Sequence, residues 1–244
     1  MRNRFDTAYF ISASELLSYK MLPMWDFHIH THYTDGEAGI RQIFEKAVEQ
    51  KLDVIVFTEH AELWQSDTID WFTSYIEEIK RYREVYQNKI KAFIGVEANA
   101  VSFAGEIELT AQMKENTEFI LGAVHRYPGL GRRKIHDLSK TEAIDLEYRA
   151  LMGLAATKEI DAIAHIGATC TKYCTPFPMG LAREIIKAAT KNNIAVEINP
   201  VYHKPLIRFL EMCAEENAVL TMGSNAHGLK DIGLIVKELR RVLS

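Results

Sequence analysis

The stretch 25-WDFHIHTHYTDG-36 carries Asp26, His28 and His30 at alternate positions. Alternate residues of a β-strand point to the same face, so this spacing predicts a strand with two imidazoles and one carboxylate on one side. We expect His28 and His30 to chelate one metal ion. Asp26 is expected to accept a hydrogen bond from a ligand imidazole and to fix its tautomer.

The residues between these polar positions are apolar. Phe27 and Ile29 are expected to point the other way and to pack under helices. His32 follows the strand, where alternation no longer applies, and we interpret it as a loop or substrate-facing residue. The stretch therefore predicts a site and a core on opposite faces of one strand.

The composition of the 244-residue chain excludes several classes of protein. Its hydrophobic content of 48% is typical of a globular protein with a sizeable core. A net charge of −4 gives no electrostatic sign of nucleic-acid binding. No window approaches the roughly 18 apolar residues that a membrane-spanning helix needs. Three cysteines without a recognisable secretory leader predict a cytoplasmic protein with free thiols.

Short apolar runs alternate with helical patterns along the chain. The runs lie at 24–30, 53–58, 90–97, 118–124, 161–165, 195–199 and 219–223, and the helical patterns lie near 39–50, 69–88, 141–158, 179–192, 204–217 and 230–242, with a weaker one near 107–115. This alternation predicts an α/β fold of parallel βα units. Seven units without a linker favour one closed barrel, although an open doubly wound sheet would give a similar pattern.

Two further features bear on the fold. No Gly-rich dinucleotide fingerprint follows the first strand, which counts against a Rossmann fold. Residues 1–22 are expected to form an amphipathic extension that packs on the body. Residues 23–244 are expected to form a single barrel domain.

Every predicted strand ends in polar side chains. They are His28 and His30, Glu59 and His60, Glu97, His125, His165, Glu197 and Asn199, and Asn225 and His227. The carboxyl ends of barrel strands meet at one mouth, so these residues should converge. Six of the nine histidines have this placement, and a core would have to satisfy each buried imidazole separately. A metal cluster would satisfy them together.

The motifs 28-HIH-30, 33-YTDG-36, 58-TEH-60, 95-GVEAN-99, 122-GAVH-125, 162-AIAH-165 and 223-GSNAH-227 follow the order and rough spacing of a known family. The chain resembles the PHP (polymerase and histidinol phosphatase) superfamily, in particular its compact stand-alone bacterial phosphoesterases. The resemblance implies a distorted seven-stranded (β/α)7 TIM-like barrel. It also implies two or three divalent metal ions, usually zinc, manganese or iron, in a site that is trinuclear when full.

The resemblance also implies the metal ligands, position by position. One metal would be held by His28, His30, Glu97 and Asn225; a second by Glu97, His125 and His165; and a third by Asp35, His60 and His227. Mixed imidazole and carboxylate ligands suit zinc, manganese or iron. The family usually has Asp where this chain has Asn225, an amide that brings no charge and cannot act as a general base.

The implied activity is hydrolysis of a small phosphomonoester, such as histidinol phosphate, a nucleotide or a sugar phosphate. Three dications can bind phosphate oxygens and acidify a water, so a metal-bound hydroxide would attack and no protein nucleophile is needed. The absence of a GxSxG motif and of a phosphatase-type cysteine loop agrees with this. The alternative, suggested by Asn225, is a metal-binding or regulatory PHP protein with weakened catalysis.

Other readings stay open. The same class includes a protein-tyrosine phosphatase or a nuclease, although the acidic composition counts against nucleic acid. An amidohydrolase on the same barrel lacks a candidate for the carbamylated lysine, and the chain carries no polymerase domain for an editing module. We expect a small phosphorylated substrate and no membrane partner. A homo-oligomer is compatible with the sequence.

Residues around the predicted mouth complete the expectations. Arg126, Arg132 and Arg133 follow His125 in a Gly- and Pro-containing loop and are candidates for gripping the substrate phosphate. Tyr127 and His136 are expected to line the same pocket. Cys170 and Cys174 are interpreted as ordinary thiols rather than ligands. Glu197 and Asn199 end a strand at the mouth and are expected to support a ligand or contact the substrate. Glu59 is open to orienting a ligand or being a surface carboxylate, and His203 begins a helix and is open to facing solvent.

Overall fold

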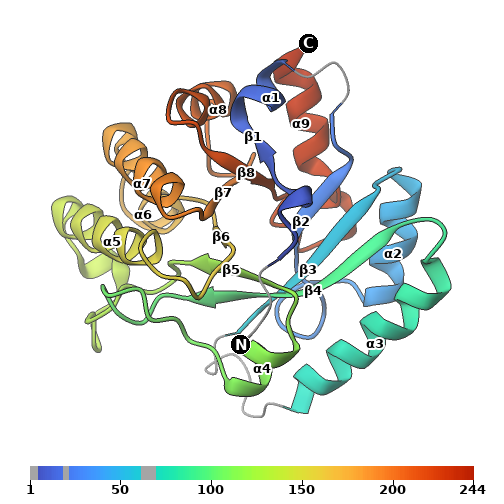
Figure 1. Cartoon of the computed structure of the whole chain (residues 1–244). Coiled ribbons are helices and arrows are strands. Elements are labelled where there is room, and N and C mark those ends of the chain that lie inside the picture. The colour runs from blue at the N-terminus through green and yellow to red at the C-terminus, as the bar shows by residue number, and fades with distance from the viewer. Residues whose placement is uncertain (1–4, 19–21, 62–69) are drawn as a thin grey trace.

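The seven apolar runs form neighbouring strands of one curved sheet, and helices cover its outer side (Figure 1). The computed structural model describes residues 5–18, 22–61 and 70–244. The strands are β1 (Ile11–Ser12), β2 (Trp25–Ile29), β3 (Val54–His60), β4 (Lys91–Asn99), β5 (Phe119–Ala123), β6 (Ala162–Ile163), β7 (Ala195–Ile198) and β8 (Val219–Met222). They are ordered β1-β8-β7-β6-β5-β4-β3-β2.

Strands β2 to β8 correspond to the seven predicted strands, and each neighbouring pair is parallel. The sheet nevertheless has eight strands, not seven, because β1 adds an antiparallel edge strand with Ile11 opposite Leu220. The other edge curves toward β8, where an isolated parallel bridge joins Ile29 to Ala226. The fold is therefore α/β, and the carboxyl ends of the parallel strands β2 to β8 all lie at the same end of the curved sheet.

The helices mostly follow the strands as expected. They are α1 (Ala13–Ser18), α2 (Ile40–Glu49), α3 (Asp70–Tyr86), α4 (Ala111–Asn116), α5 (Lys140–Leu154), α6 (Ala168–Tyr173), α7 (Met179–Lys191), α8 (Leu206–Glu215) and α9 (Leu234–Leu243), with 3-10 turns at Thr7–Tyr9, Ile135–Asp137 and Leu229–Asp231. The short α6 was not among the expected helices. No helix in the described ranges has the length and apolarity to cross a bilayer.

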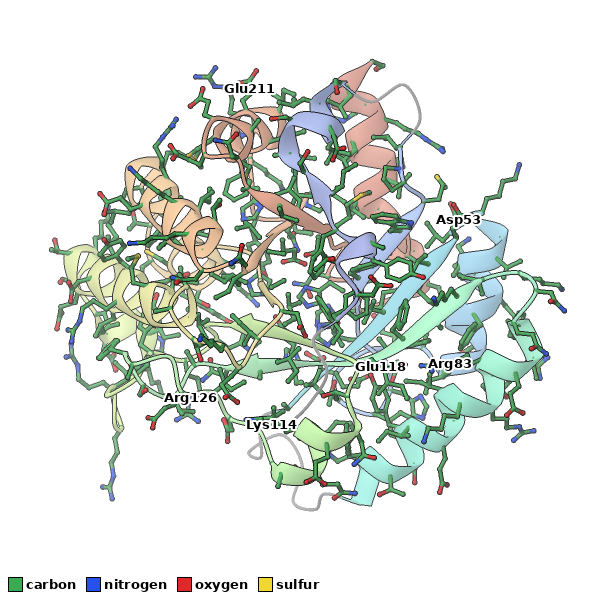
Figure 2. All side chains as sticks on the ribbon, viewed as in Figure 1. Asp53, Arg83, Lys114, Glu118, Arg126 and Glu211 are labelled. Carbon is green, nitrogen blue, oxygen red and sulfur yellow. The ribbon has the colours of Figure 1, made fainter. Side chains whose placement is uncertain are left out.

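Alternate residues of the strands belong to two different buried clusters. Ile55 and Phe57 of β3 belong to the cluster that includes the helices, and the Phe57 ring lies 5.5 Å from that of Phe44 on α2. Val54 and Val56 belong to a second cluster formed chiefly by residues of the sheet. Ion pairs tie the helices to the sheet as well, such as Arg83 to Glu118 at 2.6 Å (Figure 2).

The alternation expected for β2 is interrupted. Asp26 lies opposite Ile55 and Ile29 opposite Phe57, so three steps along β2 match two steps along β3. One extra residue of this kind is a β-bulge, and it reverses the facing of the residues beyond it. Phe27 therefore joins the sheet cluster, with its ring 6.0 Å from Phe119, and the expectation that it packs under helices was wrong. Ile29 does pack on the helix side.

Residues near the N-terminus pack against the sheet. Phe5 is buried in the sheet cluster, and its ring lies 4.9 Å from Phe93 and 5.1 Å from Phe119. The backbone N–H of Phe5 donates to Asp161 at 3.3 Å. Helix α1 packs against α8. Residues 1–4 and 19–21 of the expected extension lie outside the described residues.

Candidate metal centre

Glu97, near the end of β4, is the centre of the site. Its side chain is fully buried, and it lies between imidazoles from four other segments of the chain. The Glu97 oxygens lie 2.9 Å from His165 Nε2, 3.2 Å from His60 Nδ1, 3.3 Å from His125 Nε2, 3.4 Å from His28 Nε2 and 3.6 Å from His30 Nε2. The strand ends thus converge as the sequence predicts.

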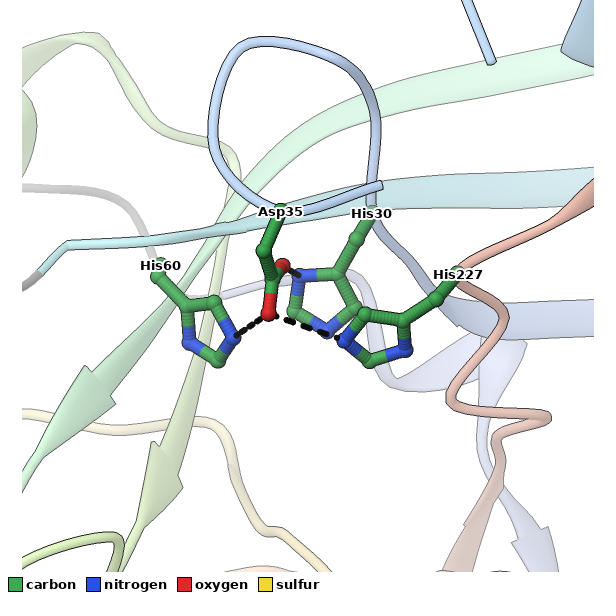
Figure 3. A group of neighbouring side chains, drawn as sticks. All are labelled: His30, Asp35, His60 and His227. Atoms are coloured by element: carbon green, nitrogen blue, oxygen red, sulfur yellow. Dashed lines mark ion pairs between the residues drawn. The ribbon is translucent and has the colours of Figure 1, made fainter. Parts of the chain in front are cut away.

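A second group lies at the rim of the mouth (Figure 3). Asp35, in the loop after β2, has one oxygen 3.4 Å from His60 Nε2 and 3.3 Å from His227 Nε2. Its other oxygen lies 3.8 Å from His30 Nδ1. The carboxylate of Asp35 is 47% exposed, whereas the Glu97 carboxylate is 0% exposed.

The donor atoms form four overlapping groups whose members lie within 4.8 Å of one another. These are His30, Asp35, His60 and His227; His28, His30 and Glu97; His28, His165 and Glu197; and His60, Glu97 and His125. Ligands about 2.1 Å from one ion lie roughly 3 to 3.5 Å apart, so the observed spacings suit chelation. His28, His30 and His60 each belong to two groups, which the sequence did not indicate.

Several buried donor atoms fit a metal better than they fit the protein. Among the described residues, His30 Nδ1, Glu97 Oε2 and Asn225 Oδ1 are buried without a hydrogen-bond partner. Leaving such atoms unsatisfied costs about 1–3 kcal/mol each. All three belong to the expected ligand set, so a bound cation would remove a penalty that the side chains do not remove among themselves.

The conformation of Asn225 is consistent with a constrained role. Its φ of 50° places it in the left-handed region, which Asn tolerates better than most residues. It lines the cavity at the mouth together with His227. The amide oxygen is therefore held at the site by the backbone following β8.

Glu197 of β7, rather than Asp26, orients the first imidazole. His28 Nδ1 lies 2.6 Å from Glu197 Oε1, which leaves His28 Nε2 facing His30 Nε2 at 3.0 Å. The second Glu197 oxygen accepts the backbone N–H of His165 at 2.6 Å. Burial lowers the pKa of His28, but the carboxylates of Glu197 and Glu97 outweigh it and raise that pKa to about 10.

Asp26 has a different function from the expected one. Because the bulge separates it from His28, its carboxylate accepts the backbone N–H groups of Ser224 at 2.9 Å and Gly233 at 2.8 Å. Burial raises the pKa of Asp26 to about 6. Asp26 thus anchors the segment that carries Asn225, and the expectation that it fixes an imidazole tautomer was wrong.

Two further buried polar residues hold the loops of the mouth. Glu59 accepts the N–H of Thr31 at 2.6 Å and the hydroxyl of Thr34, and so fixes the loop before Asp35. Burial raises the pKa of Glu59 to about 7. Asn99 Oδ1 accepts the N–H of His125 at 2.7 Å. Glu59 is therefore not a surface carboxylate.

Sequence reasoning missed Glu147 on α5. It is 1% exposed and accepts hydrogen bonds from the Tyr127 hydroxyl at 2.9 Å, from the Thr169 N–H at 3.2 Å and from the Cys170 N–H. It thereby joins the loop after His125 to the helix after His165. The signal in the sequence was a carboxylate among the apolar residues of the buried face of this helix.

The remaining expected residues are distributed as follows. Arg126 lines the cavity at the mouth, but Arg132 and Arg133 do not, and Arg133 pairs with Glu142 at 3.1 Å. Tyr127 is buried against Glu147 and does not line the cavity either, and His136 is exposed.

The thiols and the other two histidines lie apart from the donor groups. Cys170 and Cys174 donate to the carbonyls of Thr175 and Ile135 and belong to none of the described groups. His32 is exposed and lies against Tyr33. His203 is buried, accepts the Asn199 N–H at 3.1 Å and stacks on Phe209. Asn199 and His203 are thus structural partners at the end of β7.

The mouth of the curved sheet thus holds overlapping imidazole–carboxylate groups that could bind metal ions. The family model of the PHP domain matches residues 26–201, most of the chain. This protein belongs to the PHP domain family.

The chain is also similar to relatives called phosphatases and to a solved structure. A "Probable phosphatase" of Vibrio parahaemolyticus is 26% identical over 219 residues, and one of Vibrio cholerae is 28% identical; each alignment covers 85% of this chain and 79% of the relative. The crystal structure of histidinol phosphate phosphatase from Lactococcus lactis, complexed with zinc, L-histidinol and phosphate, aligns with a TM-score of 0.69 at 20% identity and covers 91% of this chain and 93% of that one. At this identity the structural similarity shows the fold alone.

Proposed function

We propose that this protein is a metal-dependent phosphoesterase that hydrolyses a small phosphomonoester. The observation that carries the proposal is the convergence of five imidazoles on the buried Glu97 carboxylate. Relatives called probable phosphatases, and a zinc- and phosphate-bound protein of the same fold, support it. Histidinol phosphate, nucleotides and sugar phosphates are the substrate types to test.

The described donor groups support part of the ligand assignment that the family implies. His28, His30 and Glu97 form one group and Asp35, His60 and His227 belong to another, whereas His125 and His165 fall in separate groups. His28, His30, Glu97 and Asn225 would hold one ion, Glu97, His125 and His165 a second, and Asp35, His60 and His227 a third. Zinc, manganese or iron suits this donor set. When bound, such ions would neutralise phosphate oxygens and lower the pKa of an attacking water.

The protein's own groups would position the substrate. Arg126 lines the same cavity as the donor groups and can bind phosphate oxygens bidentately. Glu197 holds His28 in the tautomer whose Nε2 faces the site. Since neither Cys170 nor Cys174 lies in the donor groups, no protein nucleophile is assigned.

A second candidate function is a metal-binding or regulatory protein with weakened catalysis. It is favoured by the neutral amide of Asn225 at a position where the family resemblance implies a carboxylate. The two functions make different predictions for Asn225→Asp, a change that the left-handed backbone tolerates because Asp also adopts this region.

The deciding experiment measures phosphate release from a panel of phosphomonoesters, with manganese, zinc or iron supplied, for the native chain beside Asn225→Asp. Activity in both proteins supports the phosphoesterase, with Asn225 as a working ligand. An inert native chain and an active variant would support the regulatory alternative. Metal content measured on the same samples separates lost binding from lost catalysis.

We also propose that residues 23–244 form one (β/α)7 barrel domain, which residues 1–22 extend. Support comes from the Ile29–Ala226 bridge between the two ends of the parallel sheet and from Phe5 in the sheet cluster. Phe5→Ala should lower the free energy of unfolding by about 3 kcal/mol, as for other buried Phe.

A cytoplasmic location is proposed from the free thiols of all three cysteines.

A further inference from the structure

The cavity at the mouth extends beyond the donor groups. Its volume is about 350 Å³, at the lower end of the range for pockets that hold small molecules. The walls not formed by the candidate ligands are Arg126, Ile135, Ala168, Thr169, Lys172, Tyr173 and Tyr202. This part of the cavity would receive the leaving group of a bound phosphoester.

One wall of the cavity has an aromatic side chain that can pack against a ring in the leaving group. Tyr202, in the segment after β7, is partly buried, and its ring lies 5.3 Å from that of His165. Ile135 and Ala168 supply apolar surface to the same cavity. Aromatic side chains favour offset or edge-to-face contacts with a ring at such distances.

The same cavity carries a cation on α6. Lys172 is exposed, and its ammonium lies 5.1 Å from the centre of the Tyr173 ring, hydrogen-bonds to Tyr173 and is attracted by the charge of Asp35. Arg126 is the other basic residue in the wall of this cavity. Burial lowers the pKa of Lys172, but contact with Tyr173 raises it above its usual value, so the ammonium stays charged.

Carboxylates that could receive a positive leaving group are engaged elsewhere. Among the described residues that line the cavity, the carboxylates are Asp35 and Glu97, and both belong to the donor groups. The positive charge of Lys172 would therefore repel an ammonium on the leaving group and attract an anion, in a wall that also carries Arg126.

We propose that the site selects phosphomonoesters whose leaving group is a ring carrying a second negative charge, bound by Lys172 beside Tyr202. The proposal rests on the proposed function, because it takes the donor groups as the place of the phosphoryl group. It makes Lys172 a specificity-determining residue and disfavours cationic leaving groups such as amino alcohols.

The test uses phosphonates, whose carbon–phosphorus bond the enzyme does not hydrolyse. Calorimetry would compare methylphosphonate, phenylphosphonate, its 3- and 4-carboxy derivatives and its 4-aminomethyl derivative on the metal-loaded full chain. Native protein, Lys172→Met and Lys172→Glu are the proteins to compare, with melting temperatures as the folding control. Tyr202→Leu adds a test of the ring contact.

In the native protein a carboxylate should tighten binding of the ring about tenfold, as one charge-assisted contact allows, and an aminomethyl group should weaken it. Lys172→Met should abolish the gain, and Lys172→Glu should reverse the order. Tyr202→Leu should weaken the aryl probes but not methylphosphonate. No gain from the carboxylate, no binding of any phosphonate, or an equal loss for all probes in Lys172→Met would overturn the proposal.

Hydrolysis of the matching aryl phosphates separates this inference from the proposed function. If the binding preference holds and no phosphate is released, the phosphoesterase proposal fails and the assignment of Lys172 stands. If the esters are hydrolysed without any charge preference, the phosphoesterase proposal holds and the assignment of Lys172 fails.

Discussion

The inner and outer halves of the metal centre are built differently. The inner half is His28, Glu97, His165 and Glu197, all buried. Glu197 accepts the backbone N–H of His165 and lies 2.6 Å from His28 Nδ1, which holds both histidines in place. The outer half is Asp35, His60, Asn225 and His227; Asp35 is 47% and His227 37% exposed, whereas His60 is buried and links the two halves. Loops after β2 and β8 supply three of these four. We therefore expect the inner half to bind its ion more tightly and the rim to exchange its ion.

The largest expected effect is at the centre that both halves share. Glu97→Gln keeps the shape of the side chain but removes the charge that five imidazoles face. We expect phosphate release to fall about a thousandfold, in the range found when one stabilising group is removed from an active site. Metal analysis should show at least one ion lost. An active Glu97→Gln protein with full metal content would refute the cluster.

Asp35→Asn tests the rim alone. The carboxylate lies closest to His227 and His60, at 3.3 and 3.4 Å, and farther from His30, at 3.8 Å, so its loss should release one ion and leave the inner ions bound. Activity should fall about a hundredfold. Chelator titration should remove the rim ion first from the native protein. Equal loss of all ions in Asp35→Asn would show that the halves are not independent.

Glu197→Gln tests the support of the inner half. The variant can still accept one hydrogen bond, but it loses the charge beside His28. Replacing such a partner of a metal-binding histidine typically weakens metal binding 10–100-fold. A competitive metal-binding titration would measure it, with Glu211→Gln on the exposed side of α8 as the control. Unchanged affinity would limit Glu197 to a structural function.

A separate effect, on stability rather than on activity or metal affinity, concerns pH and Glu147. Burial raises the pKa of Glu147 from 4.5 to about 7, so the folded state holds this proton more tightly than the unfolded chain. Its contribution is most favourable below pH 4.5 and is lost as the pH rises toward 7, by about 3 kcal/mol at most. Glu147→Gln should flatten the pH dependence of the free energy of unfolding between pH 4.5 and 7. Parallel slopes for both proteins in urea titrations would contradict this.

The sequence predicted the repetitive parts of the molecule well. Strands β2 to β8 follow from local apolar runs, and His60, Glu97, His125 and His165 were placed because each ends a strand. The bulge in β2 could not be foreseen, because it depends on pairing with β3. The partners of Asp26, Glu197 and Glu147 also lie far away in sequence, so only the folded chain reveals them.

The buried atoms His30 Nδ1, Glu97 Oε2 and Asn225 Oδ1 lack hydrogen-bond partners, so metal binding at this centre would be coupled to folding of the chain. A cation that binds only the folded chain stabilises it by about 2.7 kcal/mol when its free concentration is a hundred times its dissociation constant. Cells that run short of that cation would hold more unfolded chain, which proteases remove. The abundance of the protein would then follow metal supply without any change in its synthesis.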